Sequence, residues 1–265
     1  MTSHPAYEEV RDVTPFASVL LQRNPNPMTL DGTNTWLLRA PDSTETIVVD
    51  PGQSDDTHLE RLLAAAREVS LVLVTHRHFD HSQLAEAMRA RTGAPVRAIE
   101  SQYCFGAEPL VDGEELHSAG LDVRVLSTPG HTSDSVSFLV GDNDAVLTGD
   151  TVLGRGTTVV AHPDGVLGPY LDSLRKLSAL GDATVLTGHG PELPSIADVA
   201  QMYLAHREER LNQVRAALAQ LGPDATARQI VEIVYADVDK SVWFAADLSV
   251  EAQLAYLRST QLGGR

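Results

Sequence analysis

Side chains that bind metal ions gather within six positions of this 265-residue chain. They are His76, His78, Asp80 and His81. An apolar run at residues 71–74, with the character of a buried strand, stops just before them. Residues two apart in an extended segment project to the same side, so the first three can converge, and the fourth joins them if the chain turns into a helix. Three imidazoles and one carboxylate match the ligands of zinc, manganese or iron, whereas a polar surface loop has no need of this spacing.

Three further candidate ligands each follow a predicted strand and have a glycine beside them. They are His131 in Thr-Pro-Gly-His-Thr, Asp150 in Leu-Thr-Gly-Asp-Thr and His189 in Leu-Thr-Gly-His-Gly. Glycine lets the backbone approach a ligand closely. Each residue alone would more often be structural, but together with the first four they would lie along one edge of the strands. Seven ligands exceed the four of a usual zinc site and suit two ions that share a bridging carboxylate and a bridging water.

The elements that must position these ligands follow from the spacing of the apolar residues. Strands are predicted at residues 16–23, 34–39, 46–49, 71–74, 96–99, 121–126, 136–140, 145–147 and 184–186. Helices are predicted at residues 56–69, 82–91 and 170–180. The strands come first in runs and then alternate with helices, which predicts a layered α/β arrangement around two sheets.

After Pro194 the pattern becomes entirely helical. A long helical stretch comes first, a Gly-Pro pair breaks it, and Asp224 stands where it can cap a second helix. A third helix is predicted to begin at Ser249. The sequence therefore predicts a catalytic domain at residues 1–194 and a small helical domain at residues 195–265.

Composition limits the partners and the compartment. No run of about 18 apolar residues is present, so we expect no membrane span. The N-terminus lacks a basic start followed by an apolar block, and the single cysteine allows no internal disulfide, so we expect a cytoplasmic protein. A net charge of −16 argues against broad attraction to nucleic acid or anionic lipid, although a local basic groove stays compatible with it. The sequence leaves open whether the protein forms a homodimer.

The order of the candidate ligands resembles that of the metallo-β-lactamase-fold hydrolases. The resemblance implies a four-layer αββα sandwich, of α/β (α+β) class, with a small winged-helix-like domain at the C-terminus. It implies a first metal held by His76, His78 and His131, a second metal held by Asp80, His81 and His189, and Asp150 as the bridge. It also implies that Asp50, in Val-Val-Asp-Pro-Gly, supports the histidine loop by hydrogen bonding.

Within that superfamily the chain is most similar to the beta-lactamase-like protein 2 group of endoribonucleases. The matching stretches include Asp31-Gly-Thr-Asn-Thr-Trp, Gly149-Asp-Thr-Val-Leu-Gly-Arg-Gly and His206-Arg-Glu-Glu-Arg. The resemblance implies two divalent ions, zinc foremost with manganese or iron as alternatives. It further implies that a metal-bridging hydroxide attacks phosphodiester bonds of single-stranded RNA.

A dinuclear centre of this kind suits hydrolysis. Metal binding lowers the pKa of water from 15.7 to about 7, so a hydroxide forms that can attack a phosphorus or carbonyl carbon. Asp80 could pass a proton to the leaving group while Asp150 bridges the ions. Asp80 and Asp150 are therefore the candidate catalytic residues. Candidate substrate contacts, to an anionic or ester-type substrate, are Arg155, Gly156, Thr157, Thr158, His206 and Arg207. A plain glycine-rich turn and a solvated helix face are the alternative interpretations of these last two stretches.

Thioester hydrolysis of the glyoxalase II type is the alternative function, because it uses the same seven ligands. Glyoxalase II carries basic glutathione-binding residues in its C-terminal helices, and the sequence after Pro194 has no such cluster. β-Lactam hydrolysis is disfavoured, because lactamases of this fold are exported and lack the bridging aspartate. A non-catalytic binding module is disfavoured because none of the ligands has been lost. His58 and His117 are expected to be surface histidines.

Overall fold

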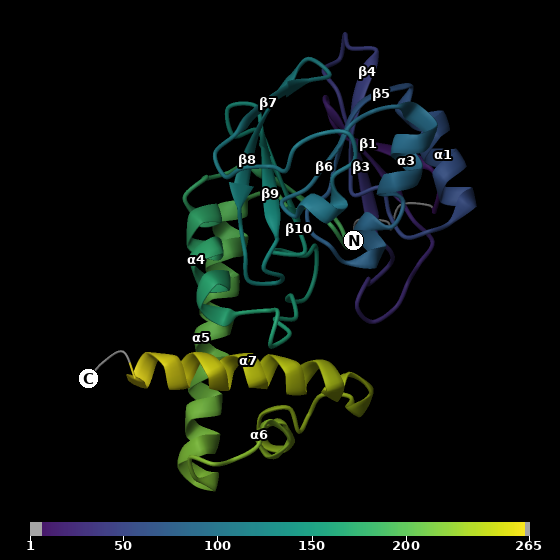
Figure 1. The fold of residues 1–265 in the computed structure, drawn as a ribbon. Helices are drawn as coiled ribbons and strands as arrows, with labels where there is room; N and C mark the ends of the chain where they lie inside the picture. The colour runs from purple at the N-terminus through teal and green to yellow at the C-terminus, as the bar shows by residue number, and fades with distance from the viewer. Residues whose placement is uncertain (1–6, 263–265) are drawn as a thin grey trace.

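Two β-sheets packed face to face form the centre of the protein, as the computed structural model of residues 7–262 shows (Figure 1). The first sheet runs in chain order and contains β1 (Val10–Thr14), β2 (Ala17–Leu21), β3 (Asn34–Leu38), β4 (Glu45–Val49), β5 (Glu68–Leu73) and β6 (Val96–Arg97). The second sheet has the order β11-β10-β9-β8-β7 and contains β7 (Glu115–Ser118), β8 (Leu121–Ser127), β9 (Val136–Val140), β10 (Ala145–Gly149) and β11 (Thr184–Thr187). Each strand predicted from the sequence is present.

Helices cover both outer faces of the paired sheets (Figure 1). Those on the first sheet are α1 (Asp56–Ala66) and α3 (Ala85–Thr92), and those on the second are α4 (Leu167–Ser178) and α5 (Ile196–Leu221). The remaining helices are α2 (Phe79–Ser82), α6 (Ala227–Val234) and α7 (Trp243–Leu262), with short 3-10 turns η1 (Ser101–Tyr103) and η2 (Lys240–Val242). The expected four-layer αββα sandwich is confirmed. None of the helices in the described part of the chain combines the length and apolarity that crossing a membrane requires.

Alternate side chains of the central strands enter different cores. Ile47 and Val49 of β4 pack between the two sheets, while Val48 faces the layer of α1 and α3. In β9, Phe138 points between the sheets and Leu139 points toward the layer of α4 and α5. A strand buried on both faces carries apolar residues at most of its positions. The continuous apolar runs in the sequence have this cause.

The directions of the strands bring their ends to one edge. β10 and β11 are parallel. β9 pairs antiparallel with both β8 and β10, so β8 runs in the same direction as β10 and β11. β4 and β5 of the first sheet are also parallel. The sheets are tied together at this edge, because the Asn34 backbone N–H donates to the Gly188 carbonyl at 2.8 Å and the Trp36 indole donates to the Thr187 carbonyl at 2.9 Å. Loops from both sheets therefore meet there.

Two edge strands, β1 and β7, were not expected from the sequence. Their residues, Val-Arg-Asp-Val-Thr and Glu-Leu-His-Ser, are largely polar, and β1 has no fully buried position. Edge strands are exposed along one side and carry charged residues that discourage pairing with other chains. Such strands lack the apolar pattern on which sequence prediction depends.

Two of the C-terminal helices, α6 and α7, begin at other residues than the sequence predicted. Asp224 does not cap α6; Thr226 does, because its hydroxyl accepts from the Gln229 N–H while the Gln229 side chain accepts from the Thr226 N–H. This reciprocal capping box satisfies two helix-end donors at once. The third helix begins at Trp243 rather than Ser249, and its first turn is stabilised by an indole hydrogen bond to the Val238 carbonyl at 3.0 Å.

One hydrophobic core extends from the second sheet into the C-terminal helices. It includes Val146 of β10, Leu174 of α4, Leu211 of α5 and Val250 of α7. The first half of α5 lies along α4, and α7 crosses α5 beyond the sandwich (Figure 1). The boundary between residues 1–194 and 195–265 stays a prediction. Within residues 196–262, which the structure describes, the elements are helical.

The core between the sheets generates a stability prediction. Phe138 lies in the centre of this core and its side chain is 0% exposed. Phe138→Ala should therefore lower the free energy of unfolding, measured by urea titration, by about 3–5 kcal/mol. Val111, 65% exposed, provides the control, and Val111→Ala should change that free energy by no more than about 0.5 kcal/mol. Equal changes for the two variants would contradict this placement of the core.

Candidate metal centre

All seven candidate ligands lie together where loops of the two sheets meet. They form two groups, and within each group the ligand atoms lie within 4.8 Å of one another. The first group is His76, His78, His131 and Asp150, and the second is Asp80, His81 and His189. The predicted convergence is thus confirmed, while the role of each side chain as a metal ligand stays a prediction.

The second group has the spacing of a tetrahedral metal site. The Nε2 atoms of His81 and His189 lie 3.3 Å apart, and Oδ2 of Asp80 lies 3.3 and 3.1 Å from them. Oδ1 of Asp150 lies 3.5 and 3.4 Å from the same two nitrogens. A tetrahedral zinc ion with bonds of about 2.0–2.1 Å places its ligand atoms about 3.4 Å apart. These four atoms therefore surround a space of the right size for one ion.

The first group is similarly close and shares Asp150. Nδ1 of His78 lies 3.0 Å from Nε2 of His76 and 3.1 Å from Nε2 of His131. Oδ2 of Asp150 lies 3.6 Å from the His131 nitrogen, while its Oδ1 belongs to the second group. One oxygen of this carboxylate thus faces each group, as a bridging ligand requires.

Two ligand rings are oriented by backbone carbonyls. Nδ1 of His131 donates to the Val159 carbonyl at 2.9 Å, and Nδ1 of His189 donates to the Gly32 carbonyl at 3.0 Å. A carbonyl can only accept a hydrogen bond, so the proton of each neutral ring is assigned to Nδ1. The lone pair on Nε2 then points into the centre.

Two other rings are oriented by the buried carboxylate of Asp50. Its Oδ2 accepts from His81 Nδ1 at 2.8 Å and from the Thr75 hydroxyl at 2.7 Å, and its Oδ1 accepts from the Thr75 N–H at 2.8 Å. Because the Thr75 hydroxyl donates to Asp50, it accepts from His76 Nδ1, 3.0 Å away. Asp50 thus orients one imidazole of each group, in agreement with the supporting role expected of it.

The donor chemistry fits two divalent cations. Ring nitrogens of five imidazoles and oxygens of two carboxylates face one another in the two groups, an arrangement that is repulsive unless protons or metal cations supply positive charge. Oδ1 of Asp150 is buried without a hydrogen-bond donor, which is costly for a carboxylate oxygen. Nitrogen and oxygen ligands of this kind suit zinc, and also manganese or iron.

The ionisation of the ligands agrees with this fit. Burial disfavours the charged form of Asp150, but the neighbouring His189 and His81 outweigh burial and hold its pKa well below the usual range. Burial and the nearby His131 lower the pKa of His78 to about 4. Burial would also lower the pKa of His189, but Asp150 and Asp80 outweigh it and raise that pKa to about 9. A cation would displace this proton on binding.

An arginine inside the ligand motif connects three loops. The Arg77 guanidinium lies 2.9 Å from Glu100 and 3.6 Å from the buried Asp134, and it is ion-paired with Asp164. Asp134 follows His131 closely in the chain, so Arg77 ties the first ligand loop to the second. Sequence reasoning missed this role; a charged residue between two ligand histidines was the available signal.

The candidate substrate contacts divide into two sets. Residues 155–158 line a narrow hollow together with His131 and Asp150, and Arg155 is ion-paired with Asp31. Arg207 lies beneath this loop instead: it is buried, donates to the Thr158 carbonyl and lies 5.1 Å from the centroid of the Tyr170 ring. A solvated face is therefore wrong for Arg207, which holds the loop backbone.

Two histidines lie away from the metal ligands. His206 is half-buried and is not among the residues that line the hollows beside the ligands, so its contact with substrate stays a prediction. His58 was expected at the surface but is fully buried, with Nδ1 2.8 Å from Glu8 and Nε2 3.1 Å from the Thr35 hydroxyl. It packs beneath β3 because α1 brings it inward, and long-range packing of this kind leaves no mark in the local sequence.

An open cleft of ≈ 470 Å³ lies over the ligands. It is lined by Asn26, Met28, Thr29, Gln53, His78, Phe79, Asp80, Gln83, His131, Asp150 and His189. None of these is a lysine or an arginine. Phe79, 73% exposed, and Met28, 42% exposed, give the cleft apolar surfaces at the ligands. Sequence reasoning assigned no role to either residue.

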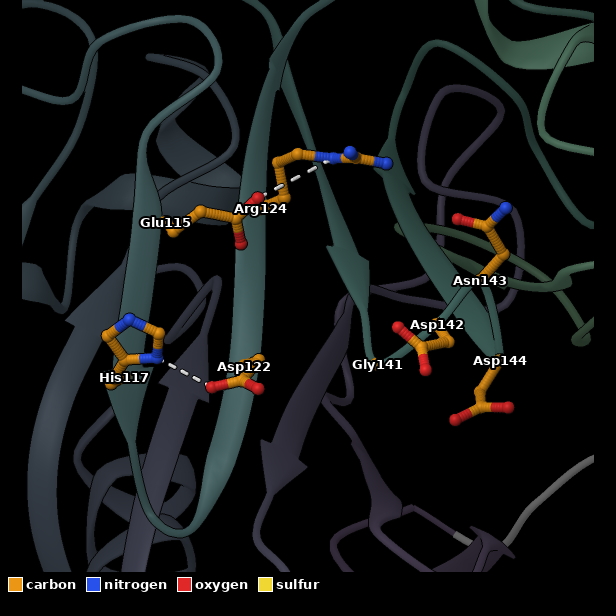
Figure 2. A pocket seen from close by; sticks show the side chains of 8 residues that line it. All are labelled: Glu115, His117, Asp122, Arg124, Gly141, Asp142, Asn143 and Asp144. Atoms are coloured by element: carbon orange, nitrogen blue, oxygen red, sulfur yellow. Dashed lines mark hydrogen bonds and ion pairs between the residues drawn. The ribbon is translucent and has the colours of Figure 1, made fainter.

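A second hollow lies at the turns that join β7 to β8 and β9 to β10. It is acidic, but its side chains do not form a ligand group like the two described above. Its carboxylates, which include Glu115, Asp122, Asp142 and Asp144, do not converge (Figure 2). Asp122 pairs at 2.6 Å with His117, and both side chains are 73% exposed. This surface pair has the chemistry of Asp50 and His81 without the burial, so it provides a matched control.

Asp50→Asn should weaken metal binding by about 10–100-fold, because an amide cannot accept from Thr75 and His81 in the same way. Competition with a chromogenic zinc chelator, together with elemental analysis, measures the effect. Asp122→Asn should leave the affinity unchanged, since both side chains of that pair are exposed to solvent. Wild-type affinity in the Asp50 variant would refute the orienting role.

Comparison with known proteins agrees with this geometry. The Atrochrysone carboxyl ACP thioesterase of Aspergillus fumigatus is 30% identical over 283 residues, which cover 99% of this chain and 88% of that protein. A Beta-lactamase-like protein 2 homolog of Caenorhabditis elegans is 29% identical over 262 residues, covering 94% and 86% respectively. The likeness to beta-lactamase-like protein 2 is thereby confirmed.

Comparisons of the structure and of family models support the same relationship. A Beta-lactamase domain protein from Burkholderia ambifaria shares the fold, with a TM-score of 0.81 and 24% sequence identity over 98% of this chain and 91% of that chain. Residues 226–262 match the Beta-lactamase associated winged helix domain. Residues 28–189, more than half of the sequence, match the Metallo-beta-lactamase superfamily, and the chain therefore belongs to that superfamily.

Proposed function

We propose that this chain is a dinuclear metal-dependent hydrolase that cleaves thioesters of apolar acyl groups. The observation that supports this substrate class is the character of the cleft over the ligands. It has apolar surfaces at Met28 and Phe79 and no lysine or arginine in its lining. An acyl thioester is uncharged at its reacting atoms, so it gains from apolar contact and needs no cationic groove.

Similarity supports the same proposal. The relative from Aspergillus fumigatus that aligns with 99% of this chain is named as a thioesterase that acts on an acyl carrier protein. A glutathione thioester is disfavoured, because the C-terminal helices carry no basic cluster of the kind glyoxalase II uses. The thiol part of the substrate is therefore expected to be a carrier or a cofactor arm other than glutathione.

The residues of the chain divide the chemistry between them. Two divalent ions held by the seven ligands would supply hydroxide at neutral pH and polarise the acyl oxygen. Asp150 presents one oxygen to each group and keeps the two halves of the centre in register. Oδ2 of Asp80 accepts from the Thr33 hydroxyl at 3.3 Å, and its carboxylate lines the cleft, where it can hold a proton beside the leaving thiol.

Phosphodiester hydrolysis is the second candidate, and the exposed ring of Phe79 favours it. Proteins that bind single-stranded RNA stack bases on aromatic side chains within a positively charged groove. The first feature is present, but the cleft has no lysine or arginine in its lining and the chain carries a net charge of −16. Cleavage of RNA therefore has weaker support than cleavage of a thioester.

A substrate panel tests the proposal. Protein loaded with zinc or manganese should release thiol from butyryl-N-acetylcysteamine, detected with a chromogenic thiol reagent, and should leave labelled single-stranded RNA and a chromogenic cephalosporin intact. Asp150→Asn should lower kcat/KM by more than about 100-fold, because the bridge between the groups is lost.

Asp122→Asn, which changes the exposed surface pair, should keep the wild-type rate. Cleavage of RNA without release of thiol would favour the second candidate. Failure to hydrolyse any substrate with both ions bound would overturn both.

A further inference from the structure

A narrow slot of ≈ 90 Å³ adjoins the open cleft on the side of the first ligand group. Its apolar walls are Pro27, Met28, Leu30, Leu153 and Val159. The loop at residues 155–158 completes the lining together with His131 and Asp150. The slot is thus a mainly apolar space beside two of the candidate metal ligands.

The slot and the cleft meet at the ligands. Met28, His131 and Asp150 line both hollows. A bond that reacts beside His131 and Asp150 therefore has the slot on one side and the cleft on the other. The two parts of a substrate separated by that bond would occupy different hollows.

The size of the slot limits what it can hold. An engineered apolar cavity of about 150 Å³ binds benzene. The slot volume of ≈ 90 Å³ is smaller than that cavity. A short aliphatic chain therefore matches the slot better than an aromatic ring or a long chain.

The charge in the slot is already compensated. Arg155 is the cationic side chain in the lining, and its guanidinium is ion-paired with Asp31. The hydroxyl of Thr158 donates to the Asp150 carbonyl and so is also occupied. The slot therefore favours an uncharged occupant over one that carries a carboxylate.

The outer wall is held from behind by buried side chains. The Leu153 N–H donates to the Tyr203 hydroxyl at 3.0 Å, and Arg207 donates to the Thr158 carbonyl. The Val159 carbonyl accepts from the His131 ring. These attachments hold residues 153–159 in place as one wall of the slot.

We propose that this slot is the acyl-chain subsite and that it selects short, uncharged aliphatic acyl groups of about two to four carbons. The thiol part of the substrate lies in the open cleft beside Phe79. This inference rests on the proposed thioesterase function. Met28 and Leu153 are its specificity-determining residues, because each is an apolar lining residue from a different one of the two loops that enclose the slot.

Chain-length selectivity tests the proposal on the metal-loaded full chain. The value of kcat/KM for acyl-N-acetylcysteamine thioesters should rise from acetyl to butyryl and fall at least tenfold for octanoyl, because one methylene in a pocket changes discrimination by about 10–200-fold. Met28→Ala and Leu153→Ala should shift the maximum to longer chains. Met202→Ala, at a 56% exposed position on α5, should leave the profile unchanged.

A profile that stays flat to octanoyl, with the Met28 and Leu153 variants matching wild type, would overturn the subsite and leave thioester hydrolysis intact. Absence of hydrolysis with every thioester, in protein shown to hold two ions, would overturn the proposed function and the subsite together. Met28 is partly exposed, so its variant should fold even if the buried Leu153 variant does not.

The charge selectivity has its own test. Asp31→Asn removes the partner of Arg155 and should raise the rate with succinyl thioester relative to butyryl thioester by at least tenfold. The double change Asp31→Asn with Arg155→Gln should cancel this gain. A succinyl-to-butyryl ratio that stays at the wild-type value in Asp31→Asn would overturn the assignment of Arg155 to the slot.

Discussion

The mutual repulsion of metal-ligand atoms is the constraint on which this structure depends. Imidazole lone pairs and carboxylate oxygens lie 3.0–3.6 Å apart in the centre, a spacing that only positive charge makes favourable. The protein meets this constraint with outward hydrogen bonds that orient the rings of His76, His81, His131 and His189. Asp50 matters most, because it orients His81 directly and His76 through Thr75. Its own backbone is held at a positive φ of 53°, a conformation that non-glycine residues seldom adopt.

Crowding at the centre also explains the glycines beside the ligands. A Cβ atom on Gly188 would lie 2.7 Å from Oδ1 of Asp150 and 2.8 Å from the His81 ring. A Cβ atom on Gly130, where φ is +135°, would lie 2.3 Å from the Cα of Tyr170. Neither site has room for a side chain. Gly188 thus lets His189 approach Asp150 and His81, and Gly130 lets the His131 loop pack against Tyr170 of α4.

The sequence predicted those parts of the fold that depend on interactions between residues close together in the chain. The ligand histidines could be recognised because strand ends and glycine turns mark them in the chain, and the central strands because burial on both faces needs continuous apolar runs. The burial of His58 and the placement of Arg207 could not be recognised, because each depends on an element distant in sequence. The start of α7 was missed because Trp243 and its neighbours lack a helical pattern, and a tertiary hydrogen bond stabilises that turn.

The substrate preference is separable from the metal chemistry in this architecture. The ligands come from strand ends that the sandwich holds rigidly, whereas the walls around them come from the loops that contain Met28 and Leu153. The second of these loops rests on α5 through Tyr203 and Arg207, so the C-terminal helices affect the slot without touching what it binds. Under the proposed function, changes in that helical layer would move the wall and alter the acyl group accepted, while the ligand arrangement proposed to hold two cations would stay the same.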